Sequence, residues 1–346
     1  EPRFEKEGLL IEGASTNLFF GEMTKDAGAP TVNHDSVISS DGTSNATEQI
    51  STLSGTPTSL SLKSGGISGS WVTGDKITWS IDIKAGVGTG GNKITINPYF
   101  SGQTEKNIGF VFSTETINGG SSAATVKKLS DGWYRLSDTS IATGSATTYT
   151  FRIWECGRVA TRNIGDSNYY AFIQLEELPF ASSYIPTTTV AVTRAANTCS
   201  VDTAGNIVAG SLYGSSTVLD VSLIGVVTAV DTYIISSGAS SPFYYRLFTD
   251  GGLKILEGST NWDSSITAAS LVNTPSRLAS TFDTTTKYIY RDGVQVYTVS
   301  ASQDTRAFNP TTYLGYGPSG TSFMYGHLKN LRIYDRVLTA SEVNMA

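Results

Sequence analysis

The sequence predicts an all-β protein made of two β-sandwich, jelly-roll-like domains in tandem. Its 346 residues include 35 glycines and 17 tyrosines, Thr and Ser are abundant, and Lys, Glu and Leu are sparse. This composition favours pleated strands joined by tight turns over long amphipathic helices. Runs with a period of two recur along the chain, and no helical period separates them. The length exceeds what one hydrophobic core usually supports, which predicts two domains.

The first half contains clear strand patterns. The segment 76–85, KITWSIDIKA, alternates apolar and polar residues and predicts a half-buried strand with one apolar face, formed by Ile77, Trp79, Ile81 and Ile83. An Asp131-Gly132 pair predicts a turn into the strand that begins at Trp133. The segment 168–178, NYYAFIQLEEL, is apolar on both faces at its centre, as expected for a strand under a second layer.

A further strand is predicted over 147–156, TTYTFRIWEC. Its alternation places three apolar residues on one face, namely Tyr149, Phe151 and Ile153. Arg152 and Trp154 share the other face. Short turn-rich loops between strands of this kind are typical of a sandwich.

The second half contains a β-hairpin signal at 287–299, KYIYRDGVQVYTV. Asp292-Gly293 suits a two-residue turn with positive φ. A regular hairpin around that turn predicts Ile289 opposite Val296 and Tyr288 opposite Tyr297. At the C-terminal end, Thr339 and Glu342 have the spacing of a capping box, which predicts one short helical turn.

The domain boundary is predicted between residues 189 and 190. Pro179 and Pro186 bias the residues before them toward extended backbone, so the stretch PFASSYIPTTT connects one sandwich to the next. The expected division is a connecting segment over 1–20, a first sandwich over 21–189 and a second over 190–346. Tyr184 and Ile185 are too apolar for a floating linker, so we expect the junction to be packed.

Charge and cysteine content exclude several classes of function. The net charge is −6 and neither half is basic, which argues against a nucleic-acid partner. No apolar run of membrane-spanning length occurs, so we expect no membrane insertion, and no leader-like stretch indicates a signal peptide. With only Cys156 and Cys199, we expect two reduced, packed thiols; a bridge between them, stapling the domains, is the alternative.

Several motifs together resemble a recurrent module of tailed-phage structural proteins, whose sandwich is similar to carbohydrate-binding modules. They are GLLIEGASTNLF at 8–19, DGTSNAT at 41–47, DGWYRLS at 131–137 and FIQLEELPFASSYIPTTTVAVTRAA at 172–196. The stretches 277–296 and 326–343, RLASTFDTTTKYIYRDGVQV and GHLKNLRIYDRVLTASEV, resemble laminin-G-like or concanavalin-A-like lectin sandwiches.

The resemblance implies a virion protein, a tail fibre that attaches to host-surface polysaccharide as a homotrimer beside other virion proteins. It would be made in the host cytoplasm and then reside on the virion exterior. The alternative is a capsid or tail decoration protein that acts through protein–protein contacts. A third hypothesis is an ancillary domain of a secreted glycoside hydrolase. The segment VTRAA at 192–196, which resembles the end of the phage module, argues against it.

Sugar binding needs exposed aromatic faces beside polar groups. The predicted glycan-binding residues are Trp262 and Asp263 in the polar loop GSTNWDSS, Tyr316 and Tyr325 among glycines, and Trp154 on its strand. Loop aromatics beside glycine are the better candidates. For Trp154 the favoured alternative is a two-sided sandwich in which the partner domain covers the ring, and any of the tyrosines could equally be packed with a satisfied hydroxyl.

No enzyme is predicted. His34 and His327 are the two histidines, and neither lies in a nucleophile-elbow context. Glu176 and Glu177 are adjacent on a strand and point to opposite faces, so they cannot flank one glycosidic bond. We expect one solvated and one hydrogen-bonded carboxylate.

No cofactor is predicted, although structural calcium is an open minority hypothesis. Asp35, Asp41 and Asn45 offer oxygen ligands in the stretch DSVISSDGTSN, without EF-hand spacing. An Asp-Gly turn accounts for Asp41 equally well and is the favoured interpretation.

Overall fold

The computed structural model describes most of the chain. The described residues are 3–21, 23–25, 31–42, 45–52, 54, 61–63, 66–122, 124–154, 162–202, 215–227, 230–237, 243–257, 260–283, 285–300, 311–320 and 322–346. Strands dominate, and α1 (Ala340–Met345) is the one α-helix among these residues, so the all-β prediction is confirmed. None of the helices in the described part of the chain has the length and apolar character that a membrane span requires.

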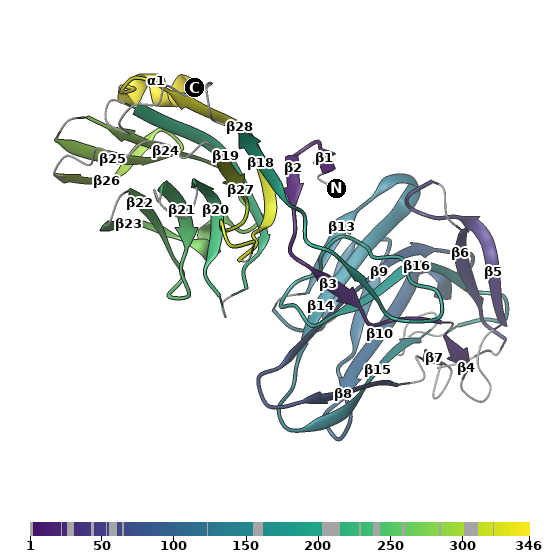
Figure 1. Ribbon diagram of the computed structural model, residues 1–346. Coiled ribbons are helices and arrows are strands. Elements are labelled where there is room, and N and C mark those ends of the chain that lie inside the picture. Colours follow the sequence, from purple (N-terminus) through teal and green to yellow (C-terminus); the bar gives the residue numbers. More distant parts are fainter. Residues whose placement is uncertain are drawn as a thin grey trace. The chain divides into compact units, whose positions relative to one another are not determined.

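The chain forms two compact units (Figure 1). Residues 15–194 form one unit; residues 1–14 and 195–346 together form the other. This differs from the predicted division, because the first 14 residues belong to the C-terminal unit and the chain leaves the inserted unit after Arg194 instead of near 189. The reason is strand pairing: β17 (Val192–Arg194) pairs with β3 (Ser15–Asn17) inside the inserted unit. The unit formed by residues 15–194 is therefore inserted within the chain of the other unit and does not precede it in tandem.

The inserted unit is a sandwich of two sheets. One has the order β13-β14-β9-β16-β6-β5: Thr125–Lys128, Trp133–Ile141, Lys76–Ala85, Ser167–Glu176, Asn45–Ile50 and Thr31–Ile38. The other has the order β12-β11-β10-β15-β7-β4, with β8 also paired to β15: Thr116–Gly119, Ile108–Val111, Lys93–Phe100, Ala146–Trp154, Ser61–Lys63, Thr24–Lys25 and Ile67–Trp71.

The core of this unit follows the predicted alternation. All four apolar residues of β9 are fully buried, and so are Tyr149, Phe151 and Ile153 of β15. The other face of β9 was predicted to be solvated, which is wrong: Thr78, Ser80 and Asp82 are buried as well. The chain after β16 contacts Thr78, whose Oγ1 donates a hydrogen bond to the Leu178 carbonyl at 2.5 Å, while Arg135 of β14 contacts both Ser80 and Asp82.

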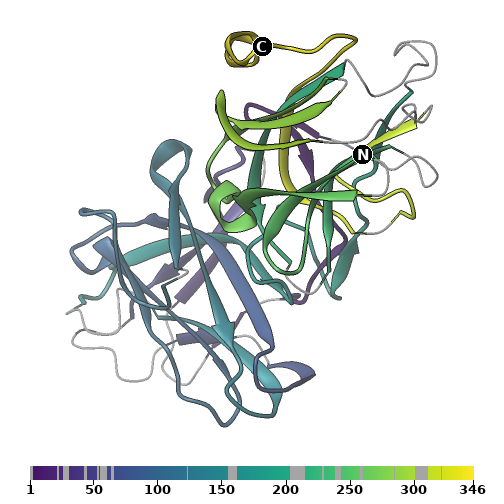
Figure 2. The same cartoon turned by 90° about the vertical axis from the view of Figure 1, so that its left-hand side faces the viewer.

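The C-terminal unit is a second sandwich. Its first sheet has the order β1-β2-β28-β19-β24-β25-β26: Arg3–Glu5, Gly8–Ile11, Tyr325–Tyr334, Ser215–Gly225, Ser276–Phe282, Thr286–Arg291 and Val294–Ser300. Its second sheet has the order β18-β27-β20-β21-β22-β23: Cys199–Asp202, Thr311–Leu314, Thr232–Ser237, Phe243–Leu247, Gly252–Glu257 and Thr260–Thr267. Helix α1 covers the outer face of the first sheet through Val343, and Leu338, just before the helix, packs in the same cluster (Figures 1 and 2).

Local turn predictions are confirmed. Asp131 and Asp292 both have positive φ, each followed by a glycine with positive φ. Thr339 and Glu342 form the predicted capping box. The predicted register of the 287–299 hairpin is wrong: Ile289 lies opposite Tyr297 and Tyr288 opposite Thr298, because an irregularity between Ile289 and Tyr290 shifts the pairing by one residue.

Cys199 is a half-buried free thiol at the start of β18, whose pKa burial raises. Cys156 lies outside the described residues, so the expected pair of reduced thiols is observed at one of its two positions.

Candidate functional site

The outer face of the second sheet in the C-terminal unit carries an aromatic and basic cluster. Along β21 the core side is apolar: Phe243, Tyr245 and Leu247 are buried between the two sheets. Successive side chains of a strand point to opposite faces. Tyr244 and Arg246 consequently lie on the outer side, where both are half-buried. Phe248 directly after the strand is half-buried too.

Cross-strand pairing extends this cluster into two rows. Tyr233 of β20 pairs with Arg246, which pairs with Lys254 of β22. In the neighbouring row, Ser236 lies between Tyr313 of β27 and Tyr244. We call this surface the aromatic face; its half-buried members are Tyr233, Tyr244, Arg246, Phe248, Lys254 and Tyr313.

Arg246 lies at the centre of the aromatic face. Its guanidinium carbon is 4.8 Å from the ring centroid of Tyr233, 4.6 Å from that of Phe248 and 5.7 Å from that of Tyr244. The Tyr233 and Tyr244 rings meet edge to face at 5.3 Å. The ammonium of Lys254 lies 4.4 Å from the Phe248 centroid. Cation–π contacts of this kind hold the rings in fixed positions.

Two carboxylates balance the cations. Asp231 forms an ion pair with Arg246, and Asp250 forms one with Lys254 at 2.7 Å. The hydrogen bond from Lys254 lowers the pKa of Asp250. Burial raises the pKa of Tyr244, with the Arg246 hydrogen bond acting in the opposite direction, so Tyr244 keeps its phenolic proton at neutral pH. The surface thus offers ring edges and faces beside hydroxyl, cationic and carboxylate groups, which is the chemistry that sugar binding uses.

Tyr316 and Tyr325 were predicted as loop aromatics, but both are packed. Tyr316 is 7% exposed, stacked on Phe323 at 5.5 Å and edge to face with Tyr313 at 5.3 Å. Tyr325 is 8% exposed, begins β28 and donates its hydroxyl hydrogen bond to the Ala14 carbonyl. Both residues show the packed alternative that the sequence left open, because neighbouring rings cover Tyr316 and the N-terminal segment contacts Tyr325. Tyr316 supports the edge of the aromatic face through Tyr313.

Trp154 is 5% exposed, and on β15 its backbone pairs with Thr95 and Ser61. It therefore presents no open ring face. A sugar-stacking role would need a face that the surrounding chain now covers.

Trp262 and Asp263 lie in strand β23 rather than in a loop. Their backbones pair with Ile255 and Lys254 of β22, which brings Asp263 into the row of Tyr233, Arg246 and Lys254. Their side chains lie outside what the structure describes, so their role in glycan binding stays a prediction.

A turn at Asp41 lies at the centre of the stretch that was considered for calcium binding. Asp41 accepts a hydrogen bond from Ser39 Oγ at 2.8 Å, and the Gly42 amide donates to the Ser39 carbonyl at 3.1 Å. The turn interpretation of Asp41 is confirmed. Asp35 lies in β5 and Asn45 begins β6, and the side chains of both lie outside the described part, as does that of His34.

The expectation for the paired glutamates is confirmed. Glu176 is fully buried and accepts hydrogen bonds from Ser15 Oγ at 2.6 Å, Gln174 Nε2 at 2.7 Å and the Ser182 amide at 2.9 Å. Glu177 is exposed and accepts one from Trp71 Nε1 at 2.9 Å. The buried Glu176 carboxylate of the QLE element thus holds the SSYIP segment, through which the chain leaves the inserted unit, in place by hydrogen bonds.

The sequence interpretation missed the aromatic face. The signal was present in FYYRLF at 243–248, where Tyr244, Arg246 and Phe248 alternate with core residues. Tyr233 and Lys254 come from neighbouring strands, and their registers depend on the sheet.

Residues 224–344 match the family described as the Concanavalin A-like lectin/glucanases superfamily. The match contains most of the second sheet, so the aromatic face lies in the part of the chain that is similar to this superfamily, as the sequence resemblance implied. No curated protein matches the chain.

Three solved structures are among those that match part of the chain. The receptor binding domain of botulinum neurotoxin C/D mosaic serotype is 15% identical, with a TM-score of 0.36, covering 43% of this chain and 40% of that one. Domain 4 of an extracellular arabinanase from Geobacillus stearothermophilus, in complex with arabinotriose, is 18% identical, with a TM-score of 0.32, covering 43% and 80%. The CBM40 of Ruminococcus gnavus IT-sialidase is 16% identical, with a TM-score of 0.32, covering 39% and 83%. The chain thus spans 40% of the length of the neurotoxin domain.

Proposed function

We propose that this chain is a non-catalytic glycan-binding protein of a tailed-phage virion, forming the receptor-binding part of a tail fibre. The observation that carries the proposal is the aromatic face on a lectin-like domain. The phage-module motifs at 172–196 support the virion assignment. Its partners are host-surface polysaccharide and other virion proteins, and it resides on the virion exterior.

Attachment follows from the geometry of the aromatic face. The apolar side of a pyranose stacks on Tyr244 or Tyr233, while hydroxyls of the sugar bond to the Arg246–Asp231 and Lys254–Asp250 pairs. Each contact is weak. A homotrimer presents three such faces. Once one face has bound a sugar of the polysaccharide, the other two meet further sugars at a high effective concentration, which strengthens attachment.

The first test is glycan binding by the purified full chain. We expect saturable binding to host polysaccharide on a glycan array, and at least tenfold weaker binding by Tyr244→Ala, a loss of about 1.4 kcal/mol. Removing Tyr244 deletes a stacking surface and one ring beside Arg246. The affinity is then measured by titration calorimetry with the best oligosaccharide.

The matched control is Tyr99→Ala. Tyr99 is also half-buried and also lies beside an arginine, with Arg152 at 5.0 Å from its centroid, but it belongs to the inserted unit. Equal weakening by both variants, or no binding to any host glycan, contradicts the assignment. An antibody against the chain, imaged on particles that carry it, tests the tail position separately, and light scattering tests the trimer.

The alternative, a capsid or tail decoration protein, is favoured by one observation. Phe4 on β1 is 84% exposed beside an apolar cavity of about 360 Å³ that Leu9, Leu219 and Leu314 help to line. Apolar surface of this kind suits protein contacts. Antibody labelling along the body of the particle, together with no binding to any glycan on the array, would support the decoration function over the receptor function.

A further inference from the structure

The N-terminal hairpin brings two glutamates against a histidine from the far end of the chain. Strand β1 ends at Glu5, Lys6 and Glu7 form the turn, and β2 begins at Gly8. Strand β2 pairs with β28, with Leu10 opposite His327. Gly8 has φ +132°, and a Cβ there would meet the Leu328 carbonyl oxygen at 2.4 Å. Only glycine therefore lets the turn approach β28 so closely.

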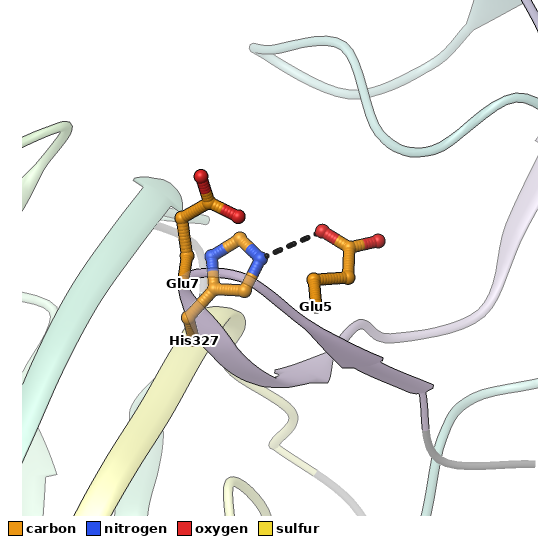
Figure 3. A group of neighbouring side chains, drawn as sticks. All are labelled: Glu5, Glu7 and His327. Carbon is orange, nitrogen blue, oxygen red and sulfur yellow. Dashed lines mark hydrogen bonds and ion pairs between the residues drawn. The ribbon is translucent and has the colours of Figure 1, made fainter.

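The three side chains converge on one point. His327 Nε2 lies 3.1 Å from Glu5 Oε2, and one ligand atom from each of Glu5, Glu7 and His327 lies within 4.8 Å of the others. Figure 3 shows the two carboxylates on two sides of the imidazole ring, with Nε2 directed at Glu5. The His327 side chain is only 13% exposed, so its ring position is fixed, whereas the side chains of Glu5 and Glu7 are exposed.

The surroundings leave this set accessible from solvent. Glu7 and His327 also line a cavity of about 510 Å³ in the C-terminal unit. Arg3 contacts Glu5 through Oε1 at 3.7 Å, which leaves Oε2 facing the histidine. A group bound between the three side chains would retain an open side for water.

We propose that Glu5, Glu7 and His327 form a binding site for a divalent transition metal ion of the zinc type, which fastens the β1–β2 hairpin to β28. One imidazole nitrogen and two carboxylate oxygens suit Zn²⁺ or Co²⁺, whereas calcium prefers oxygen ligands alone. Tetrahedral zinc with bonds of about 2.1 Å places its ligands about 3.4 Å apart. The exposed glutamates reach that spacing by side-chain rotation. The ion would take the place of the contact between His327 Nε2 and Glu5 Oε2.

The probe is zinc chloride added to the chelator-treated full chain, with binding measured by titration calorimetry. We expect one ion per chain, at least tenfold weaker binding by His327→Asn and by Glu7→Gln, and a visible d–d spectrum with cobalt. His34→Asn is the matched control, since the chain has two histidines, and it should bind like the unaltered protein. If His327→Asn does not fold, the loss of zinc binding is judged from Glu7→Gln alone. Glu7 is exposed, so this variant should fold like the unaltered chain.

Hydrogen exchange tests the fastening. Zinc should slow amide exchange in residues 8–11 of the unaltered chain and leave it unchanged in Glu7→Gln. Zinc binding that persists in both site variants, no binding at about 1 mM zinc, or exchange in the hairpin that zinc does not alter would each overturn the proposal.

Discussion

Trp79→Ala should lower the free energy of unfolding of the inserted unit by about 3–5 kcal/mol, the range for removing a large buried aromatic side chain. Trp79 is 0% exposed at the centre of β9, between β14 and β16, and its ring lies 5.6 Å from that of Phe151. Alanine leaves a cavity that two sheets cannot close without losing their pairing. Scanning calorimetry measures the loss as a lower transition temperature of this unit.

Two further variants sharpen this test. Within the described residues the indole N–H of Trp79 has no hydrogen-bond partner, so Trp79→Phe removes an unsatisfied donor along with some volume and should cost less. Tyr99→Ala, at a half-buried position, should cost less than about 1 kcal/mol. A loss below that figure for Trp79→Ala would show that β9 does not form the centre of the core.

Glu176→Ala should destabilise the same unit by roughly 3 kcal/mol or more, because each buried polar group left without a partner costs about 1–3 kcal/mol. The carboxylate holds the Ser15 hydroxyl from the start of the unit and the Ser182 amide from its exit. Gln174 completes the cluster and also binds the Ile185 amide through Oε1 at 2.6 Å. Chemical denaturation at neutral pH measures the change.

Glu177→Ala, at the adjacent position, is the control for the loss of the Glu176 hydrogen bonds. Its carboxylate is exposed, so water replaces the single bond to Trp71 and we expect a loss below about 1 kcal/mol. Equal losses for the two variants would mean that the Glu176 cluster does not hold the exit segment in place.

Features that depend on neighbouring residues could be predicted from the sequence, whereas features that depend on contacts distant in the sequence could not. The positive-φ turns at Asp131 and Asp292 and the Thr339–Glu342 capping box were predictable, because a few adjacent residues decide each of them. The apolar face of β9 was predictable for the same reason. The register beyond the Asp292 turn was not, because the irregularity near Tyr290 depends on how β25 and β26 pack.

For the candidate site, the sequence alone showed the resemblance of the C-terminal part to lectin sandwiches and the aromatic residues that are available to it. Tertiary structure decided which of them remain accessible: Tyr316 and Tyr325 are covered, while Tyr233 and Tyr244 frame Arg246. It also decided that residues 1–14 complete the C-terminal sandwich and that Glu5 meets His327. The physical reason is that burial and strand partnership depend on contacts between residues distant in sequence, whereas alternation and turns depend on neighbours alone.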